Sequence, residues 1–462
     1  MMEQQITISP IDGRAIVHRD LATPEHLDAI LSRAKAAGAE WRDMHLDDRC
    51  ALVRRGVERI VEMKSSVAEQ LTLQMGRPLR YTPAEVDGFA ARSHHMLSIA
   101  AEALNPVRPA PMEGFTRYIA REPWGTVLVI APWNYPLLTA VNAVVPALVA
   151  GNTVILKHSA QTPLAAERMV EGFVEAGVPA DVFQFVHCDH AATQALIAAP
   201  QVDYVCFTGS VAGGAAVEKA AAGRFIGVGL ELGGNDPAYV RSDANLRLAV
   251  ETIVDGAFFN SGQSCCGIQR VYVHRSRYDA FVERAITLAN QYVLGDPMKM
   301  DTTLGPLVRP AAADAVRDFV AEALSRGAKA TIDPKRFELD RPGTAYMAPQ
   351  ILVGVDHTMR VMSDECFGPV FGVMPVDGDD SAVRLMNDSP YGLTAAIFTG
   401  DAQAAAALGG RLETGTVFMN RCDYLDPALA WTGVKHTGRG ATLSLLGYEH
   451  LTRPKSYHLK HL

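Results

Sequence analysis

The stretch TVLVIAPWNYP, residues 126–136, contains a short apolar run that ends at a proline and is followed by a longer apolar run. The first run, 127–130, has the length of a buried strand, and the second, 137–150, has the length of a helix. The same order, a short apolar run followed by a helical one, recurs downstream. Strands are expected at 153–156, 183–186 and 202–207, and helices at 163–176 and 191–199. Such alternation favours a parallel sheet with helices on both faces, whose ligands bind beyond the carboxyl ends of the strands.

A second α/β cycle follows Gly233 and Gly234, and we expect it to form a separate domain. Its expected strands are 271–273, 349–353, 370–375 and 394–398, and its expected helices are 278–290, 311–323 and 382–386. A chain of 462 residues is too long for one ordinary core, so two or three units are also expected on size grounds.

Composition excludes several classes of partner. The chain has 51 acidic and 43 basic side chains, and no basic run long enough to follow a phosphate backbone, so we expect no nucleic acid partner. Neither a secretory leader nor an apolar run of spanning length is evident, so we expect no membrane partner and a cytoplasmic location. The seven cysteines are scattered without C-x-x-C spacing, which fits a reducing compartment and predicts no metal site.

The stretch FFNSGQSCC, residues 258–266, is the strongest chemical signal. It offers the thiol of Cys265 on a turn that Gly262 permits, directly after an apolar helical run, which is how a nucleophile is presented. Two adjacent thiols can also be small buried hydrophobes, and the stretch alone does not decide between these interpretations.

Three further motifs precede it: PWNYP at 132–136, FTGS at 207–210 with Gly214, and ELGG at 231–234. Together, and in this order, the four motifs resemble those of the aldehyde dehydrogenase superfamily. The resemblance implies an α/β fold with a Rossmann-like dinucleotide-binding domain, a second α/β catalytic domain and a small β oligomerisation arm. The corresponding ranges are 1–104 and 124–233 for the cofactor-binding domain, 234–437 for the catalytic domain, and 105–123 and 450–462 for the arm, which implies a homodimer or a homotetramer.

The resemblance also implies the reaction, in which an aldehyde is oxidised to the carboxylic acid with NAD or NADP. Cys265 is implied as the nucleophile that forms a thiohemiacetal and then a thioester, and Glu231 as the base that activates the hydrolytic water. Asn134 and the backbone N–H of Cys265 are implied as the donors to the oxyanion.

For the cofactor, the resemblance assigns Lys157 to the adenosine ribose, Ser210 to the pyrophosphate and Glu365 to the nicotinamide ribose, with Phe367 against the ring. The other implied cofactor-binding residues are Trp133, Ser159, Ala160, Gly209, Gly214 and Leu232. Where NAD-preferring members often carry a glutamate three residues after the lysine, this chain has Ala160. Its small side chain removes a barrier to NADP, so the cofactor is expected to be NAD or NADP.

The resemblance implies a small-molecule aldehyde as the substrate, and its identity stays open. Alignment places Tyr135, Cys266, Arg421 and Trp431 at the substrate tunnel, together with Thr139, Asn142, Ser264 and Asp423. The two aromatic residues favour an apolar body, whereas Arg421 would suit a carboxylate and Asp423 an amine. These cues disagree, and each charged residue can equally be a solvated loop residue.

Three alternatives use the same residues differently. A CoA-acylating dehydrogenase would share the Cys265 thioester but would not need Glu231 as a water-activating base. A thioester-forming cysteine hydrolase would need a histidine partner, and no motif places one. A non-catalytic binding or structural protein on this fold is disfavoured by the intact Cys265, Glu231 and Asn134.

Overall fold

A six-stranded sheet forms the centre of the first unit in the computed structural model, which describes residues 3–462. Its order is β19-β8-β7-β4-β5-β6, and every neighbouring pair is parallel except β19 with β8. The strand bounds are β4 Thr126–Ala131, β5 Thr153–His158, β6 Phe183–Phe185, β7 Tyr204–Thr208, β8 Gly227–Glu231 and β19 Gly438–Arg439. The parallel sheet expected from the apolar runs is therefore confirmed, with bounds that differ by a few residues.

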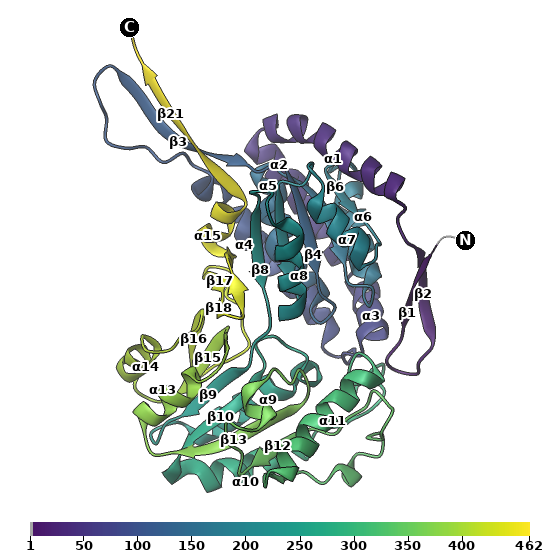
Figure 1. The fold of residues 1–462 in the computed structure, drawn as a ribbon, viewed down its shortest axis with the longest axis vertical. Coiled ribbons are helices and arrows are strands. Elements are labelled where there is room, and N and C mark those ends of the chain that lie inside the picture. The colour runs from purple at the N-terminus through teal and green to yellow at the C-terminus, as the bar shows by residue number, and fades with distance from the viewer. Residues whose placement is uncertain (1–2) are drawn as a thin grey trace.

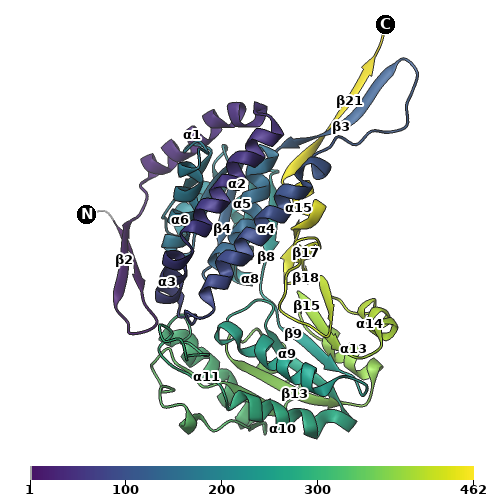
Figure 2. The same ribbon diagram turned by 180° about the vertical axis from the view of Figure 1, so that it is seen from behind.

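Alternation along β4 assigns the helices to the two faces of this sheet. Val127 and Val129 pack into a core with α2, α3, α4, α5 and α6, whereas Leu128 and Ile130 pack into another with α1, α7 and α8. Figure 1 shows α7 and α8 in front of the sheet, and Figure 2 shows α2, α4 and α5 in front from the other side. The helix bounds are α1 Pro24–Asp43, α2 Leu46–Glu62, α3 Lys64–Met75, α4 Thr82–Ala103, α5 Pro136–Ala150, α6 Pro163–Glu175, α7 His190–Ala198 and α8 Val211–Ala221.

A seven-stranded sheet forms the centre of the second unit, in the order β11-β12-β13-β10-β9-β15-β16. The strands are β9 Asp236–Val240, β10 Ile268–His274, β11 Lys329–Ala330, β12 Gln350–Val353, β13 Val370–Val376, β15 Thr394–Phe398 and β16 Thr416–Met419. The helices are α9 Leu246–Phe258, α10 Tyr278–Ala289, α11 Pro310–Ser325, α12 Arg360–Ser363, α13 Asp379–Asn387 and α14 Ala402–Gly409. Sequence patterns did not predict β9, because Pro237 inside a short run argues against a central strand; its pairing with β10 is irregular at that point.

Short elements complete the C-terminal part of the chain. They comprise β14 Tyr391–Gly392 paired with β18 Val434–Lys435, β17 Trp431–Thr432 paired with β20 Ala441–Thr442, and the helix α15 Ser444–His450. Of these, α15 lies beside α4 and α5 of the first unit (Figure 1). At the N-terminus, β1 Gln4–Ile8 and β2 Ala15–Asp20 form an antiparallel hairpin.

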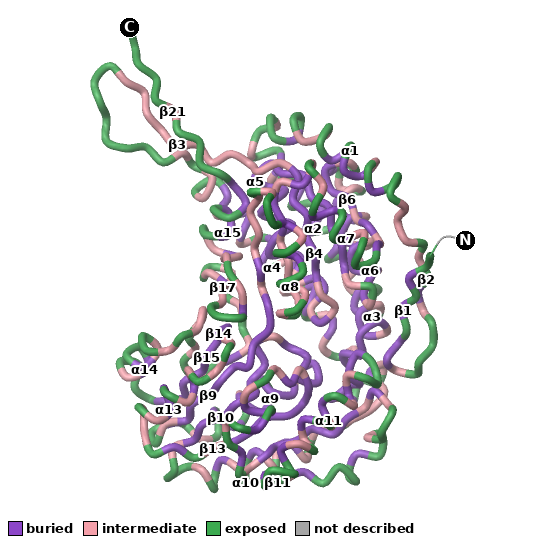
Figure 3. The backbone as a smooth tube through the Cα atoms, viewed as in Figure 1, coloured by how far each residue is buried: buried purple, intermediate pink, exposed green. Residues whose placement is uncertain are grey.

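The strands β3 Phe115–Pro123 and β21 Thr452–Lys460 form an antiparallel ribbon that projects from the first unit (Figure 1). Tyr118 stacks on Tyr457 across the ribbon, with ring centroids 4.5 Å apart. Figure 3 shows that the ribbon is mostly exposed or half-buried, unlike the fully buried strands β4, β5 and β9. Both strands belong to the segments expected to form an arm, and they pair with each other inside one chain.

Candidate active site

Cys265 lies on a turn with unusual backbone geometry between α9 and β10. After α9 the chain forms a short 3₁₀ turn, and Asn260, Ser261 and Gly262 all have left-handed φ values, of 52°, 56° and 72°. At Gly262 a Cβ atom would also clash with the carbonyl group of Gly368. The side chain of Asn260 holds the turn, because its Nδ2 donates to the carbonyl oxygens of Asn134 and Gln263, at 3.1 Å each.

The glycine pair after Glu231 brings two other segments against this turn. A Cβ atom at Gly234 would clash with the carbonyl oxygen of Cys265, and one at Gly233 would clash with the carboxyl group of Glu365. Only glycine allows the end of β8 to lie this close to both. The ELGG motif is therefore a point of close approach between the two units.

Asn134 is buried beside the same turn, and its Nδ2 donates to the carbonyl oxygen of Gln263 at 3.2 Å. A carboxamide nitrogen carries two N–H groups, so this bond uses one of them. The backbone oxygen of Asn134 accepts from Arg77 as well as from Asn260. Hydrogen bonds to the side chain and to the backbone oxygen of Asn134 therefore hold this residue in place.

Sequence analysis did not identify Arg77 or Glu85, which form a fully buried ion pair behind the turn. Arg77 Nε donates to Asn260 Oδ1 at 3.1 Å, and Glu85 Oε1 accepts from the backbone N–H of Leu137 at 2.8 Å, in the first turn of α5. A charged residue inside the apolar face of α4 was the only signal for Glu85. The pair links the Cys265 turn, Asn134 and two helices in one network.

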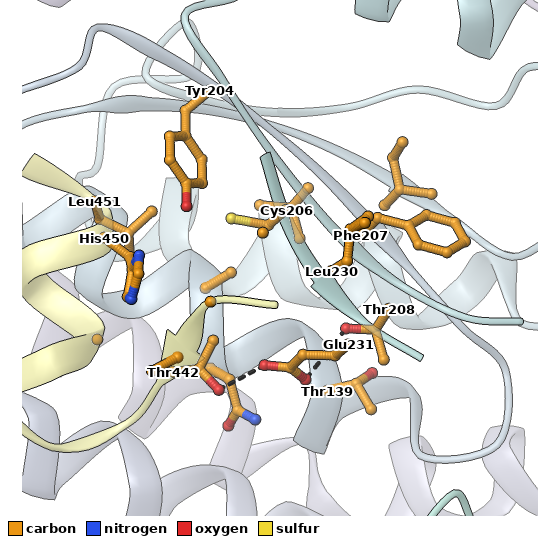
Figure 4. Close-up of a pocket in the computed structure, with 18 of the residues that line it drawn as sticks. Thr139, Tyr204, Cys206, Phe207, Thr208, Leu230, Glu231, Thr442, His450 and Leu451 are labelled. Carbon is orange, nitrogen blue, oxygen red and sulfur yellow. Dashed lines mark hydrogen bonds between the residues drawn. The ribbon is translucent and has the colours of Figure 1, made fainter. Parts of the chain in front are cut away.

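Glu231 ends β8 and lies between two hydroxyl groups (Figure 4). Thr442 Oγ1 donates to Glu231 Oε1 at 2.6 Å, and Thr208 Oγ1 donates to Oε2 at 3.4 Å. Burial raises the pKa of the Glu231 carboxyl group, while the hydrogen bond from Thr442 and the charge of Arg92 act to lower it. These features describe a carboxyl group whose carboxylate is a better proton acceptor than that of a solvated glutamate.

Two cavities meet at Glu231. The larger, of about 380 Å³, is lined by Cys265, Cys266 and Glu231, with walls from α4, α5 and the chain after β16. The smaller, of about 30 Å³, lies behind Glu231 and is the pocket in Figure 4. It has room for about one or two water molecules. The larger cavity brings the thiol and the carboxyl group into one enclosed space.

The predicted substrate residues divide into two groups. Tyr135, Cys266 and Trp431 line the larger cavity, as do four neighbours aligned with the tunnel, namely Thr139, Asn142, Ser264 and Asp423. Arg421 does not line it: this side chain is exposed, and its guanidinium carbon lies 3.3 Å from the ring centroid of Tyr424. Arg421 therefore lies outside this cavity, and its contact with the substrate stays a prediction. Arg92 of α4, which no motif indicated, lines the cavity instead.

Cys266 differs from its neighbour Cys265 in its surroundings. Its Sγ donates to Asp423 Oδ1 at 2.9 Å, and it is only 3% exposed. A hydrogen bond with Cys265, together with burial, raises the pKa of the Cys266 thiol well above its usual value. This raised pKa disfavours the thiolate form of Cys266.

The residues aligned with cofactor binding lie where the strands of the first sheet end. Lys157 is the next-to-last residue of β5, and burial lowers the pKa of its ammonium group. Ser210 caps α8, where its Oγ accepts from the backbone N–H of Gly213 at 3.1 Å, so the amides of a helix N-terminus face outward beside it. Gly209 precedes this cap, and a Cβ atom at Gly214 would press on Leu232.

The opposite side of this region comes from the second unit. Glu365 Oε1 accepts from the backbone N–H of Gly234 at 3.0 Å, and burial raises the pKa of Glu365 to about 7. Phe367 has a left-handed φ of 53°, and its ring meets Trp133 edge-on, with centroids 5.7 Å apart. Ser159 and Ala160 follow β5, and the Ala160 carbonyl oxygen accepts from Thr7 Oγ1 at 2.8 Å. The Lys157 ammonium group, the backbone amides at the start of α8 and the Glu365 carboxyl group fit the polar parts of a dinucleotide. The rings of Trp133 and Phe367 fit its aromatic part.

Residues 2–457 match the profile of the Aldehyde dehydrogenase family. The chain is 34% identical to succinate-semialdehyde dehydrogenase [NADP(+)] of Deinococcus radiodurans, over 97% of this chain and 93% of that protein. It is 32% identical to betaine aldehyde dehydrogenase of Sinorhizobium fredii, over 98% and 93%. The crystal structure of succinic semialdehyde dehydrogenase from Streptococcus pyogenes with NADP+ superposes with a TM-score of 0.93 at 28% identity, covering 99% of this chain and all of that chain.

Within residues 3–462 no helix is long and apolar enough to cross a membrane. The same part of the chain contains no group of three or more His, Cys, Asp or Glu side chains arranged to hold a metal ion.

Proposed function

Because this chain belongs to the aldehyde dehydrogenase family, which oxidises aldehydes to carboxylic acids with NAD or NADP, we propose that Cys265, Glu231 and Asn134 carry out this reaction here. The observation that carries the proposal is the cavity of about 380 Å³, which both the Cys265 thiol and the Glu231 carboxyl group line.

Cys265 supplies the nucleophile. Its thiolate attacks the aldehyde carbon and gives a tetrahedral thiohemiacetal, whose oxyanion requires fixed donors. Asn134 and the backbone N–H of Cys265 are the donors that we assign. The support is the network of Asn260 and Arg77, which fixes Asn134 before substrate arrives. One such donor is worth roughly 3 to 4 kcal/mol of barrier.

Glu231 acts after oxidation, when a thioester remains on Cys265. Its carboxylate takes a proton from water, which then attacks the thioester carbon, and the acid leaves as the thiol reforms. The raised pKa of Glu231 makes the carboxylate a stronger base than a solvated glutamate. Thr442 and Thr208 hold it at the boundary of the two cavities, where a released proton can pass to water.

For the cofactor we assign Lys157, Ser210 and Glu365 as the main polar contacts and Phe367 and Trp133 as the aromatic boundary, with Ser159, Ala160, Gly209, Gly214 and Leu232 beside them. When bound, NAD or NADP accepts the hydride released from the aldehyde carbon. The chain's own part is to orient the dinucleotide between the strand ends of β5 and β7 and the Glu365 segment.

The rival functions are less well supported. A papain-type hydrolase needs a histidine at the thiol, and none of the histidines in residues 3–462 lines the cavity of Cys265. CoA acylation has no use for the carboxyl group of Glu231 in that cavity. A non-catalytic protein would have no need for the buried network that holds Asn134.

We further propose that the β3–β21 ribbon makes the protein a homodimer or a homotetramer, working in the cytoplasm. The ribbon projects from the first unit, and a two-stranded sheet has open edges that a second copy can extend. All seven cysteines are free, as a reducing compartment requires. Light scattering after size exclusion tests the oligomer: the full chain elutes as a dimer or tetramer, and a monomer would contradict the proposal.

The test of the reaction is a panel of aldehydes assayed with NAD and with NADP by the absorbance of the reduced nicotinamide. We expect reduced cofactor and acid in equal amounts. No turnover with any aldehyde by folded wild-type protein would refute the proposed function. Relatives of nearly equal identity are named for succinate semialdehyde, which is an anion, and betaine aldehyde, which is a cation, so similarity does not choose the substrate.

A further inference from the structure

We propose that Arg92 binds a distal carboxylate of the substrate, which makes the substrate class an aldehyde that carries a negative charge at its far end. This inference rests on the proposed function, because it takes the cavity of Cys265 as the place where the aldehyde reacts. It adds a residue of α4 that no motif indicated.

Arg92 is 9% exposed, and it lines the cavity that contains Cys265. Its Nη1 donates to the carbonyl oxygen of Leu138 at 2.7 Å and to Asn142 Oδ1 at 3.2 Å. Both acceptors belong to α5, one turn apart, so they fix the guanidinium group against that helix. Arg92 is therefore held in one orientation before any ligand binds.

The remaining edge of the guanidinium has no partner. In residues 3–462, Nε and Nη2 of Arg92 donate to no acceptor, and no carboxylate lies within ion-pair distance of it. These two nitrogens form the side of the group that pairs with a carboxylate through two parallel hydrogen bonds. A buried charge with unused donors is costly unless a ligand supplies the partner.

Asp423, which lines the cavity together with Glu231, has its acidic group better compensated. Its Oδ1 accepts from Cys266 Sγ at 2.9 Å and from Ser264 Oγ at 3.4 Å. Burial raises the pKa of Asp423, and a carboxyl group can remove its own charge by taking a proton. A guanidinium group does not lose its proton in this way, so Arg92 keeps its charge; Glu231, Glu85 and Asp423 act on that charge without a direct ion pair, and a ligand carboxylate would supply one.

The cavity that Arg92 shares with the Cys265 thiol is also lined by the apolar side chains of Leu138, Leu425 and Trp431. These suit a short hydrocarbon segment between the aldehyde and the carboxylate. The expected substrate is therefore an ω-carboxylated aldehyde, with its reactive end at Cys265 and its charged end at Arg92.

The experiment compares three aldehydes of matched chain length: an ω-carboxylate, its methyl ester and an ω-amine. Wild-type holoenzyme should show the highest kcat/KM with the carboxylate. Arg92→Met should lower kcat/KM for the carboxylate by about 10- to 100-fold, mostly through KM, since a charge-assisted hydrogen-bonded pair contributes this much. The loss with the methyl ester should be at least several-fold smaller, and Arg92→Lys should recover part of the carboxylate activity.

A matched control is Arg54→Met, because Arg54 is exposed on α2 and makes no hydrogen bond or ion pair within residues 3–462. Its kinetics should equal those of wild type. If Arg92→Met does not fold, as judged by thermal denaturation, the wild-type comparison and Arg92→Lys still decide the matter.

Three outcomes overturn the inference. Equal losses with the carboxylate and the ester, with a shifted pH profile, would mean that Arg92 acts only through the charge of Glu231. A wild-type preference for the ω-amine that is lost in Asp423→Asn would assign the cavity to cationic aldehydes. A wild-type preference for the ester would mean that no charge is recognised. In each case aldehyde oxidation itself is still observed, whereas failure of the proposed function would give no oxidation of any of the three.

Discussion

The cavity has two walls that are built in different ways. The reactive wall includes Glu231, Phe259 and residues 264–266, with Asn134 buried beside the Cys265 turn, and the distal wall includes residues of α4 and of the segment 423–431. On the reactive wall, short motifs fix each position through left-handed residues and glycine contacts. On the distal wall, the charged side chains are placed by packing between segments far apart in the sequence. Local sequence therefore determines how the Cys265 thiol and the Glu231 carboxyl group are presented. The positions of the charged side chains on the distal wall depend on tertiary packing instead.

The two walls are nevertheless connected. Glu85 of α4 pairs with Arg77, and Arg77 donates to both Asn134 and Asn260 on the reactive wall. Breaking such a buried pair by removing one partner typically costs about 3 to 5 kcal/mol. Changes to α4 should therefore be confined to side chains outside this pair if only substrate recognition is to be altered.

The largest expected effect is on the reactive wall itself. Cys265→Ala removes the nucleophile, and we expect turnover to fall on the order of 10⁴-fold or more, because no other thiolate is available. Cys266→Ala should retain much of the activity, since the raised pKa of the Cys266 thiol disfavours its thiolate form and the thiol is bound to Asp423. Steady-state assays and iodoacetamide labelling with peptide mapping check this. Labelling at Cys266 with loss of activity in Cys266→Ala would reverse the assignment.

The second effect separates the two halves of the reaction. Glu231→Gln keeps Cys265 and Asn134 but removes the base, and steady turnover should fall about 10²- to 10³-fold. If the thiol ionises without Glu231, the variant should release up to one equivalent of reduced cofactor per site and then stall as an acyl enzyme. Stopped-flow absorbance with intact-mass detection of the adduct measures both steps. Turnover at the wild-type rate would remove Glu231 from the mechanism.

The sequence could predict most of the reactive wall and most of the sheets. Continuous apolar runs placed β4 at 127–130 against an observed Thr126–Ala131, because a strand buried on both faces has an unmistakable composition. It could not predict Arg92, Arg77 or Glu85, since their roles depend on how α4 meets α5. It also could not show that Arg421 is exposed and packs on the ring of Tyr424, since this contact depends on the local path of the chain after β16.

The third-largest effect is expected at Thr442, which does not line the larger cavity but donates a hydrogen bond to Glu231. Its hydrogen bond stabilises the carboxylate of Glu231, so Thr442→Val should raise the pKa of Glu231 further. The base is active when ionised, so a higher pKa moves the acid limb of kcat to higher pH. We expect about a tenfold loss on the acid side of the profile and little change on its alkaline side, because a hydrogen bond to a charged group is worth this much.

Thr442→Ser keeps the hydroxyl group and provides the matched control, with a pH profile like that of wild type. A uniform loss at every pH in Thr442→Val, not recovered in Thr442→Ser, would mean that Thr442 only supports the packing of β17 and β20.

The smallest expected effect concerns the edge of the cofactor site, where Ala160 replaces an acid found in many NAD-preferring relatives. Ala160 is exposed, and only its backbone is used, as the acceptor for Thr7, so a longer side chain can enter solvent without disturbing that contact. Ala160→Glu would place a negative charge near the 2′-phosphate of NADP, and repulsion between solvated charges at this range is about 1 kcal/mol. The ratio of KM for NADP to KM for NAD should therefore rise about fivefold, and less in high salt, because ions screen exposed charges. Ala160→Gln has the same shape without the charge and should leave the ratio near that of wild type. If both variants change the ratio equally, size and not charge acts at this position, and if neither does, Ala160 does not face the ribose.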